Sequence, residues 1–594
     1  MSEPDARVAR LSAAKRELLA RWMAEDAPDD DGPARSDGPR TEAERTVAAV
    51  WQEVLELDRV GIDDDYFALG GDSVHAIVIV AKLELAGWRI TAQDLFDLPT
   101  VRAVAQRATR EAPASARPRT PAPDAYPLGP MQEGMLYHSA GGSGPGAYLV
   151  QVCCLLTGPL DPAAFRAAWQ TVVAASPALR VFFDWHERTH PRQVVAPEAE
   201  MVVDHLDWRD RDEADRATAL TAFLDRDRAR GFDLGSAPLL RLTLLRESDT
   251  AHRCVWTHHH LILDGWSQQL VLADVLDCYR ALTAGERPRV PDRPAMPDYL
   301  DWLRTRDHAA DERFWAGQLT GVTAATRIAG PDRANGHVAA VRRGDVTLTV
   351  PRALAAGLDA FCRRNGLTVS TVLHGGWALL LAELCASTDV VFGVTVSGRP
   401  PGLPGATELV GLLINTVPLR VDCAPDGVVL PWLHELQHRL AGMREHGHVP
   451  LGRITRGLGP GRGPGLFDTI VVIENFPTAV GRNAGDGLRI EEVRTVVDEG
   501  YPLVLEIVPG EELRLLARHD PARLPASRVR AMLDALTACL AAFVADPAQP
   551  LSGPRTLLAR RNEQHLEQER RADRDAAGRD VRAARRRKTD EERA

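Results

Sequence analysis

The chain has 594 residues, which is too long for one hydrophobic core and predicts about three to four domain-sized units. Its formal net charge of −11 argues against nucleic acid as a partner. The polar start is no secretory signal and the apolar runs are too short to cross a membrane, so we expect a cytoplasmic protein that binds no membrane. The eight scattered cysteines lack metal-ligand spacing and predict buried thiols, with neither a disulfide framework nor a metal site.

The first 40 residues are predicted to form a helix and a linker. Leucines and a tryptophan in the segment 11–24 recur on one helical stripe, which predicts a short docking or packing helix. The segment 25–40 contains the run Asp29-Asp30-Asp31 and two Gly-Pro breaks but no apolar period. This segment is therefore predicted to be a flexible acidic linker.

A small helical domain is predicted over residues 41–110. Thr41 begins a capping box ahead of a first amphipathic helix. A second helix is predicted from about residue 74 to 86, and two shorter helices start at Thr91 and Thr100. The four helices form a bundle at the low end of domain size.

Ser73 lies at the start of the second predicted helix. On spacing alone it is a helix cap, because serine is favoured at helix N-termini. The run Asp65-Tyr66-Phe67-Ala68-Leu69-Gly70-Gly71-Asp72-Ser73, however, resembles the signature of peptidyl carrier domains in nonribosomal peptide synthetases. The resemblance implies that a separate phosphopantetheinyl transferase attaches 4'-phosphopantetheine to Ser73, which then carries an acyl or aminoacyl thioester. Residues 111–125, rich in proline and alanine, are predicted to be a semi-extended tether behind this domain.

Residues 126–557 interleave helices and strands over a length that needs more than one core. Prolines crowd together between Pro291 and Pro297, and we place a break there. The prediction is a first lobe at 126–295 and a second lobe at 296–557, with a cleft between them.

Three consecutive histidines, His258 to His260, precede an Asp-Gly turn. The segments 242–245 and 253–256 predict paired strands, and a helix is predicted from about Gln268. The histidines thus lie where a strand runs into a loop, a place that holds side chains rigid beside a cleft. Zinc binding lacks further ligands here, while a buried structural role and a general-base role both remain open from the residues alone.

The run His259-His260-Leu261-Ile262-Leu263-Asp264-Gly265 resembles the HHxxxDG signature of condensation domains from the same synthetases. Further motifs of that family are matched in the same order, at 127–136, 179–183, 299–302, 410–420 and 467–472. The resemblance implies a small all-α four-helix carrier bundle followed by a two-lobed α/β condensation domain with chloramphenicol-acetyltransferase-like lobes. It also implies amide bond formation between a carrier-bound donor and an acceptor amine.

The resemblance assigns roles to residues of the catalytic loop. His260 would orient or deprotonate the acceptor amine, and His259 would support the fold beside it. Asp264 would form a buried ion pair with Arg180, and Gly265 would let the arm approach closely. Two further residues would line the channel or the contact between the lobes: Trp266 and Asn415.

Three alternatives remain open: an epimerase-like domain, an ester-forming condensation variant, and a non-catalytic platform that recruits other enzymes. The chain shows no adenylation motif and no second carrier signature. The expected partners are therefore a separate adenylation enzyme and upstream or downstream synthetase carrier proteins. Residues 558–594, rich in charge and poor in apolar side chains, are predicted to be disordered or a solvated helix with a docking role.

Overall fold

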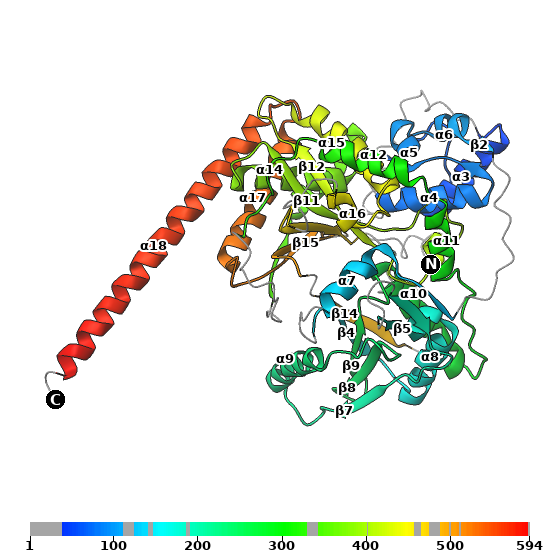
Figure 1. The fold of residues 1–594 in the computed structure, drawn as a ribbon, viewed down its shortest axis with the longest axis horizontal. Coiled ribbons are helices and arrows are strands. Elements are labelled where there is room, and N and C mark those ends of the chain that lie inside the picture. The colour runs from blue at the N-terminus through cyan, green and yellow to red at the C-terminus, as the bar shows by residue number, and fades with distance from the viewer. Residues whose placement is uncertain are drawn as a thin grey trace, which may run out of the picture.

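A helical domain, two lobes built on separate sheets and a long C-terminal helix make up the computed structural model (Figure 1). The helix predicted at 11–24, most of the acidic linker and nearly all of the tether at 111–125 lie outside the described residues. The structure describes residues 38–110, 124–140, 146–185, 191–329, 343–400, 402–456, 465–474, 487–497, 500–509 and 512–591.

The first domain contains α3 (Glu42–Leu55), α4 (Ser73–Leu85), α5 (Ala92–Asp97) and α6 (Val101–Arg107). Thr41, Thr91 and Thr100 each accept a hydrogen bond from the backbone N–H three residues further on, which caps α3, α5 and α6. The predicted four-helix bundle and these helix starts are confirmed. A short antiparallel pair of β1 (Trp88–Arg89) and β2 (Thr109–Arg110) closes the domain.

The first lobe has a five-stranded sheet with the order β14-β4-β9-β8-β7. Thr243 lies opposite Val255 in the antiparallel pair of β8 and β9, so the predicted strand pairing is confirmed. Helices α8 and α10 pack over one face of the sheet, where Trp169 meets Trp256, and α9 packs over the other. The bounds are β4 (Leu149–Thr157), β7 (Val203–Asp207), β8 (Leu240–Arg246), β9 (Ala251–His259), β14 (Arg489–Val497), α8 (Pro162–Ala175), α9 (Glu213–Arg230) and α10 (Gly265–Thr283).

A smaller sheet with the order β3-β6-β5 completes this lobe. Its strands run antiparallel to one another and join the start of the first lobe to the segment around Arg180. The bounds are β3 (Ala125–Pro127), α7 (Pro130–Ala140), η1 (Pro177–Arg180), β5 (Val181–Asp184) and β6 (Arg192–Val195).

The second lobe has a six-stranded sheet with the order β10-β16-β15-β13-β11-β12, in which β13 runs parallel to both neighbours. The apolar helix α14 is buried in its core. The strands are β10 (Gly344–Thr349), β11 (Asp389–Val396), β12 (Asn415–Asp422), β13 (Thr469–Ile473), β15 (Leu503–Val508) and β16 (Arg514–His519). The helices are α12 (His308–Leu319), α13 (Arg352–Asn365), α14 (Val369–Leu384), α15 (Val429–Glu445), α16 (Leu451–Arg456) and α17 (Ala526–Ala545).

The two lobes exchange chain segments, so the single boundary predicted at 295/296 needs correction. Helix α11 (Met296–Arg304) buries Met296 and Tyr299 in the core of the first lobe. The segment around η2 (Ala406–Glu408) joins the same core, and β14 adds an edge strand to the first sheet beside β4. The proline cluster marks a loop, but it carries no information about which core the next helix joins.

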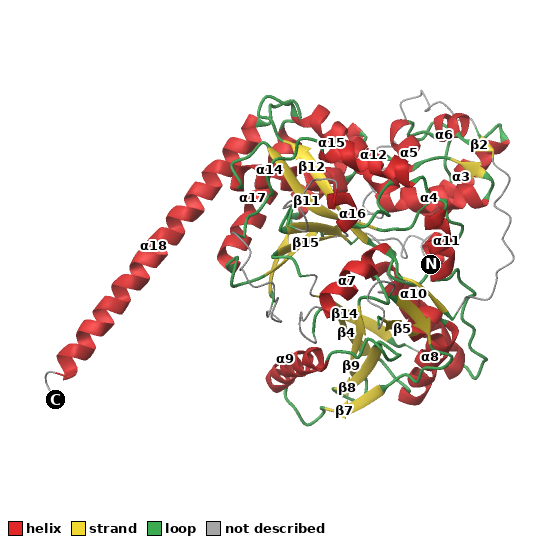
Figure 2. Ribbon diagram, viewed as in Figure 1, coloured by secondary structure: helices red, strands yellow, loops and turns green. Residues whose placement is uncertain are grey.

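The C-terminal tail is helical. Helix α18 (Ser552–Glu591) buries Leu558 in the core of the second lobe and then extends away from the body of the protein (Figure 2). Of the two predicted states, the structure therefore has the solvated helix, with Arg571 and Glu567 as one exposed i,i+4 ion pair at 3.8 Å. Among the described residues, no single helix is both long and apolar enough to span a membrane.

Candidate functional site

The three histidines lie at the end of β9, and strand alternation separates them. His258 is fully buried and packs against Trp256, at 5.1 Å between ring centroids. His259 follows on the opposite face of the sheet, because successive side chains of a strand point in opposite directions. His260 has left the strand, and its backbone N–H donates to the Tyr148 carbonyl at 2.8 Å. Only the third histidine is therefore carried by the loop.

The first two histidines have structural partners. His258 donates from Nδ1 to the His259 carbonyl at 3.2 Å, and the Leu261 N–H donates to His259 Nδ1 at 3.2 Å. Burial lowers the pKa of both rings to about 3. Both rings are thus neutral at neutral pH, and the Nδ1 lone pair of His259 is used to hold the loop.

His260 is held in the form that a general base requires. Its Nδ1 lies 2.9 Å from the Leu263 carbonyl, which only accepts hydrogen bonds, so the ring proton resides on Nδ1. The Nε2 lone pair is left to accept a proton from a substrate. Burial lowers the pKa of His260, against the opposing effects of its backbone hydrogen bonds and the Asp264 charge, and this keeps the ring neutral.

Asp264 is a structural residue that caps α10 and pairs with Arg399. Both side chains are 0% exposed, and the guanidinium donates to the two carboxylate oxygens at 3.0 and 3.1 Å. The carboxylate also accepts the backbone N–H groups of Ser267 at 2.8 Å and Leu413 at 3.0 Å. Burial alone raises the pKa of Asp264, but Arg399 and these hydrogen bonds bring it below the ordinary value.

The predicted ion pair between Asp264 and Arg180 is wrong. Arg180 ends η1 and donates to the backbone carbonyls of Ala196 and Pro197, which ties η1 to the segment after β6. The role that the resemblance gave to Arg180 belongs to Arg399, 135 residues along the chain from Asp264.

Arg399 was missed because nothing local links it to the histidine loop. It follows Gly398, whose φ of +62° favours glycine and where a Cβ atom would lie 1.6 Å from the Leu413 carbonyl oxygen. A glycine next to an arginine at a strand end was the one available signal, and it is weak without knowledge of the fold.

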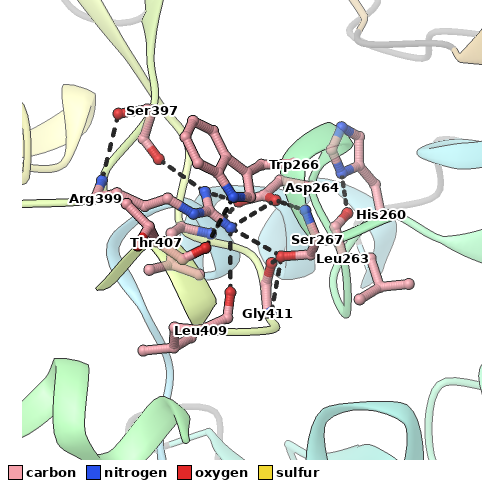
Figure 3. A network of polar contacts seen from close by, with 11 residues as sticks. His260, Leu263, Asp264, Trp266, Ser267, Ser397, Arg399, Thr407, Leu409 and Gly411 are labelled. Atoms are coloured by element: carbon pink, nitrogen blue, oxygen red, sulfur yellow. Dashed lines mark hydrogen bonds and ion pairs between the residues drawn. The ribbon is translucent and has the colours of Figure 1, made fainter. Parts of the chain in front are cut away.

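A polar network fastens the histidine loop to the segment that returns from the second lobe (Figure 3). The Ser267 hydroxyl donates to the Gly411 carbonyl at 2.8 Å and accepts from Arg399 at 2.9 Å. The Trp266 indole donates to the Thr407 carbonyl at 2.9 Å, and the Arg399 guanidinium lies 5.0 Å from the indole centroid. Trp266 therefore contacts the segment that links the lobes.

The two remaining predicted site residues are Asn415 and Gly265. Asn415 is buried and donates to the carbonyls of Gly447 at 2.8 Å and Val449 at 2.7 Å, so its amide fixes a loop within the second lobe. Gly265 is the first residue of α10 and is partly exposed. Gly265 directly follows Asp264 in the chain, whereas Asn415 lies outside the network of Asp264 and Arg399.

The carrier loop presents Ser73 as the first residue of α4. Gly70 has a φ of +88°, and a Cβ atom on Gly71 would lie 2.3 Å from the Tyr66 ring. Tyr66 is itself fixed, because its hydroxyl donates to the Asp72 carbonyl at 2.5 Å. The two glycines let the chain turn tightly over a buried tyrosine immediately before the serine.

A cavity of about 890 Å³ joins the carrier loop to the second lobe. Gly70 to Asp72 line one part of it, and Arg399 lines another, next to the Asp264 loop. His260 is not among its lining residues. The docked carrier is held by α5 and α15, where the Gln93 amide lies 2.7 Å from His438 Nδ1.

These residues fit an attached pantetheine arm. The cavity reaches Gly70 to Asp72, which directly precede Ser73 in the chain, and its volume is within the roughly 300–1,000 Å³ range of ligand pockets. No group of three or more metal-ligating side chains in the described part of the chain is placed to hold a metal ion.

The sequence matches two described domain families. A condensation domain is matched over residues 122–566, and a phosphopantetheine attachment site over residues 45–108. A component of the linear gramicidin synthase of Brevibacillus parabrevis is 34% identical over 447 residues, which is 75% of this chain and 6% of that protein. Chondramide synthase cmdD of Chondromyces crocatus is 38% identical over 387 residues, which is 64% of this chain and 10% of that protein. The chain thus spans a tenth or less of these relatives.

Solved structures share the fold. The first condensation domain of the calcium-dependent antibiotic synthetase, in complex with a substrate analogue, matches with a TM-score of 0.61 at 21% identity, over 72% of this chain and 98% of that chain. A four-domain nonribosomal peptide synthetase bound to AMP and glycine matches with a TM-score of 0.63 at 18% identity, over 74% of this chain and 34% of that chain. The expected fold class, a carrier bundle followed by a two-lobed α/β domain, is confirmed.

Proposed function

The chain belongs to the condensation domain family and has a phosphopantetheine attachment domain ahead of it, as in nonribosomal peptide synthetases, and from this we propose that it forms amide bonds. The donor would be an acyl or aminoacyl group carried on Ser73, and the acceptor an amine delivered by a second carrier. The observation that supports this proposal best is the hydrogen bond from His260 Nδ1 to the Leu263 carbonyl, which leaves Nε2 as a base.

The phosphopantetheine arm on Ser73 supplies an activated thioester when bound. His260 Nε2 would accept a hydrogen bond from the acceptor amine, which orients the nitrogen, and would take a proton as the amine attacks the thioester carbonyl. The C–N bond forms as the C–S bond breaks, and His260 would return the proton to the departing thiolate. A general base contributes about 10²–10⁴-fold, whereas holding two reactants in place contributes roughly 7–11 kcal/mol at best. Positioning is therefore the larger effect, and His260 assists it.

The ion pair of Asp264 and Arg399 contributes to positioning without touching the reactants. It holds the loop that carries His260 against the segment returning from the second lobe. Because neither side chain is exposed, no water competes for these bonds. The base is thereby fixed relative to both lobes.

Partners and location form part of the proposal. A carrier domain implies a phosphopantetheinyl transferase and other synthetase domains or modules. We propose a separate adenylation enzyme and upstream or downstream synthetase carrier proteins as the sources of the acyl groups, in the cytoplasm. All eight cysteines are free thiols, which suits a reducing compartment.

The proposal is tested by loading the apo protein with a synthetic acyl group, using a phosphopantetheinyl transferase and acyl-coenzyme A. An amine acceptor is then added, and intact-mass spectrometry follows the loss of the acyl group together with amide product by liquid chromatography. Ser73→Ala should not load, and His260→Ala should load normally but lose most amide formation. The exposed His205, changed to alanine, is a control that should behave like the wild type.

Near-normal amide formation by His260→Ala would exclude the general-base role. Deuterium incorporation at the α-carbon of a Ser73-bound aminoacyl group, without amide product, would instead favour the epimerase-like alternative. Hydroxyl acceptors assayed in parallel distinguish ester formation from amide formation.

A further inference from the structure

A histidine on α14 is built into the wall of the cavity and has no part in the proposed chemistry. His374 is 2% exposed and lies in the second turn of this helix, whose N-terminus Thr368 caps. It lines the cavity together with Ser370 and with Gly70 to Asp72 of the carrier loop. A buried polar side chain on a cavity wall calls for a hydrogen-bonding partner.

One ring nitrogen of His374 has a partner and the other has none. Nδ1 donates to the Ser370 carbonyl at 2.7 Å, so the proton of the neutral ring resides there. Nε2 is buried and has no hydrogen-bond partner among the residues that the structure describes. Burial lowers the pKa of His374 to about 4, which keeps Nε2 a lone-pair acceptor at neutral pH.

A second buried histidine, His519, has the same hydrogen-bonding pattern but does not line the cavity. His519 also donates from Nδ1, to the Leu524 carbonyl at 2.7 Å, and its Nε2 likewise has no partner in the described part of the chain. A Cβ atom on Gly344 would lie 2.4 Å from that nitrogen, so the ring is packed against β10, and His519 is not a cavity residue. Of these two histidines, only His374 belongs to the cavity wall.

The neighbours of His374 indicate which ligand this is. Arg444 also lines the cavity, and its pKa falls to about 10 on burial, partly offset by the charge of Asp72. The same guanidinium lowers the pKa of His374. Arg444 is thus close enough to both His374 and Asp72 of the carrier loop for their charges to interact. An acceptor nitrogen in this position pairs with a ligand that has a hydrogen-bond donor, and a phosphopantetheine arm contains two amide N–H groups.

We propose that His374 Nε2 accepts a hydrogen bond from an amide N–H of the phosphopantetheine arm on Ser73 and so holds the arm in the cavity. The inference rests on the proposed function only in that Ser73 carries the arm. His374 is a positioning residue, because it binds the arm and not the reacting carbonyl.

Protection of the arm thiol tests the inference without any amide formation. The full-length protein is loaded with pantetheine arms bearing a free thiol, and intact-mass spectrometry follows alkylation of that thiol, with the apo protein as the baseline for the cysteines. The wild type should slow alkylation relative to free pantetheine. His374→Phe should reduce this protection about fivefold or more, because a buried N–H is left unsatisfied, and His374→Gln, which keeps an acceptor, should restore part of it.

Two analogue arms, each with one amide N–H replaced by an ester oxygen, identify the donor. One of the two analogues lacks the amide N–H that donates to His374 Nε2. With this analogue, the wild type and His374→Phe should protect the thiol equally, because the hydrogen bond to His374 is absent from both. His519→Phe is the matched control and should leave the ratio between amide and ester arms unchanged. The inference is overturned if the arm thiol is unprotected in the wild type, or if His374→Phe has the same effect with both ester arms as with the natural arm. Protection without amide formation would refute the proposed function and leave this inference standing.

Discussion

Replacing Asp264 with asparagine is expected to destabilise the protein by about 3–5 kcal/mol, because the Arg399 guanidinium remains buried without a counter-charge. The carboxylate accepts bonds from Arg399 at 3.0 and 3.1 Å and from the N–H groups of Ser267 and Leu413 at 2.8 and 3.0 Å. Asparagine offers one oxygen in place of two, and its amide N–H₂ would face one of these donors. The loss therefore includes at least one donor left unsatisfied, in addition to the charge.

Urea unfolding followed by tryptophan fluorescence measures this cost at pH 7 in four proteins: the wild type, Asp264→Asn, Arg399→Met and the double variant Asp264→Leu with Arg399→Met. The double variant should be more stable than either single variant, because it buries no unpaired charge. Arg180→Met is the control, and its effect should add to that of Asp264→Asn within about 0.5 kcal/mol. Coupling to Arg180, or single-variant costs below about 1 kcal/mol, would refute the pairing with Arg399 as the source of stability.

The ion pair of Asp264 and Arg399 also determines how the stability of the protein changes with pH. The folded pKa of Asp264 lies below its ordinary value, so its contribution is present above the unfolded pKa of about 3.9 and is lost only as the pH falls through the lower folded pKa. The stability difference between the wild type and Asp264→Asn should therefore stay constant from pH 8 to pH 5. A difference that shrinks over this range would contradict the assignment.

Three further predictions concern separate parts of the chain. Burial lowers the pKa of His260 from its ordinary value, so the amide-forming rate, divided by the uncatalysed rate of the same amine and thioester, should show no acid limb centred at or above pH 6.5; an acid limb centred at or above pH 7 would contradict this. Gly71→Ala places a Cβ atom 2.3 Å from the Tyr66 ring and should destabilise the carrier domain by about 1–3 kcal/mol, seen as faster proteolysis of this domain and slower loading; loading at the wild-type rate with unchanged proteolysis would argue against this packing. Asn415→Ala removes bonds to two buried carbonyls, one of them Gly447, and should cost about 1–3 kcal/mol in urea unfolding while arm loading stays normal; a loss of loading would contradict its purely local role.

Local signals explain what the sequence could predict. The threonines that cap the carrier helices, and the alternating side chains of β8 and β9, can each be recognised from a few neighbouring residues. The structure contains both features. Motif spacing placed His260 at the end of a strand for the same reason. The tautomer of its ring, set by a carbonyl three residues away, needed coordinates.

Contacts between residues that are far apart in the chain could not be predicted from local sequence patterns. The partner of Asp264 lies 135 residues away, and an arginine near any strand end would satisfy the same chemistry. Strand β14 joins the first sheet, and Met296 is buried in the core of the first lobe. Local sequence does not indicate whether such a segment packs against the apolar surface of the first lobe or that of the second. The helical state of the tail was one of two predicted outcomes, because exposed i,i+4 charge pairs stabilise a helix only weakly.

The strand exchange has a consequence for the order of events during synthesis. Strand β4 (Leu149–Thr157) is an edge without its neighbour until β14 (Arg489–Val497) has been made, more than 300 residues later. The first lobe thus cannot complete its sheet while the ribosome is still making the second, and at about 5–20 residues per second this leaves an unpaired edge exposed for roughly 15 seconds to a minute. Expression of the first lobe alone, ending near residue 295, should therefore yield aggregated protein, whereas co-expression with the remainder gives β4 its partner.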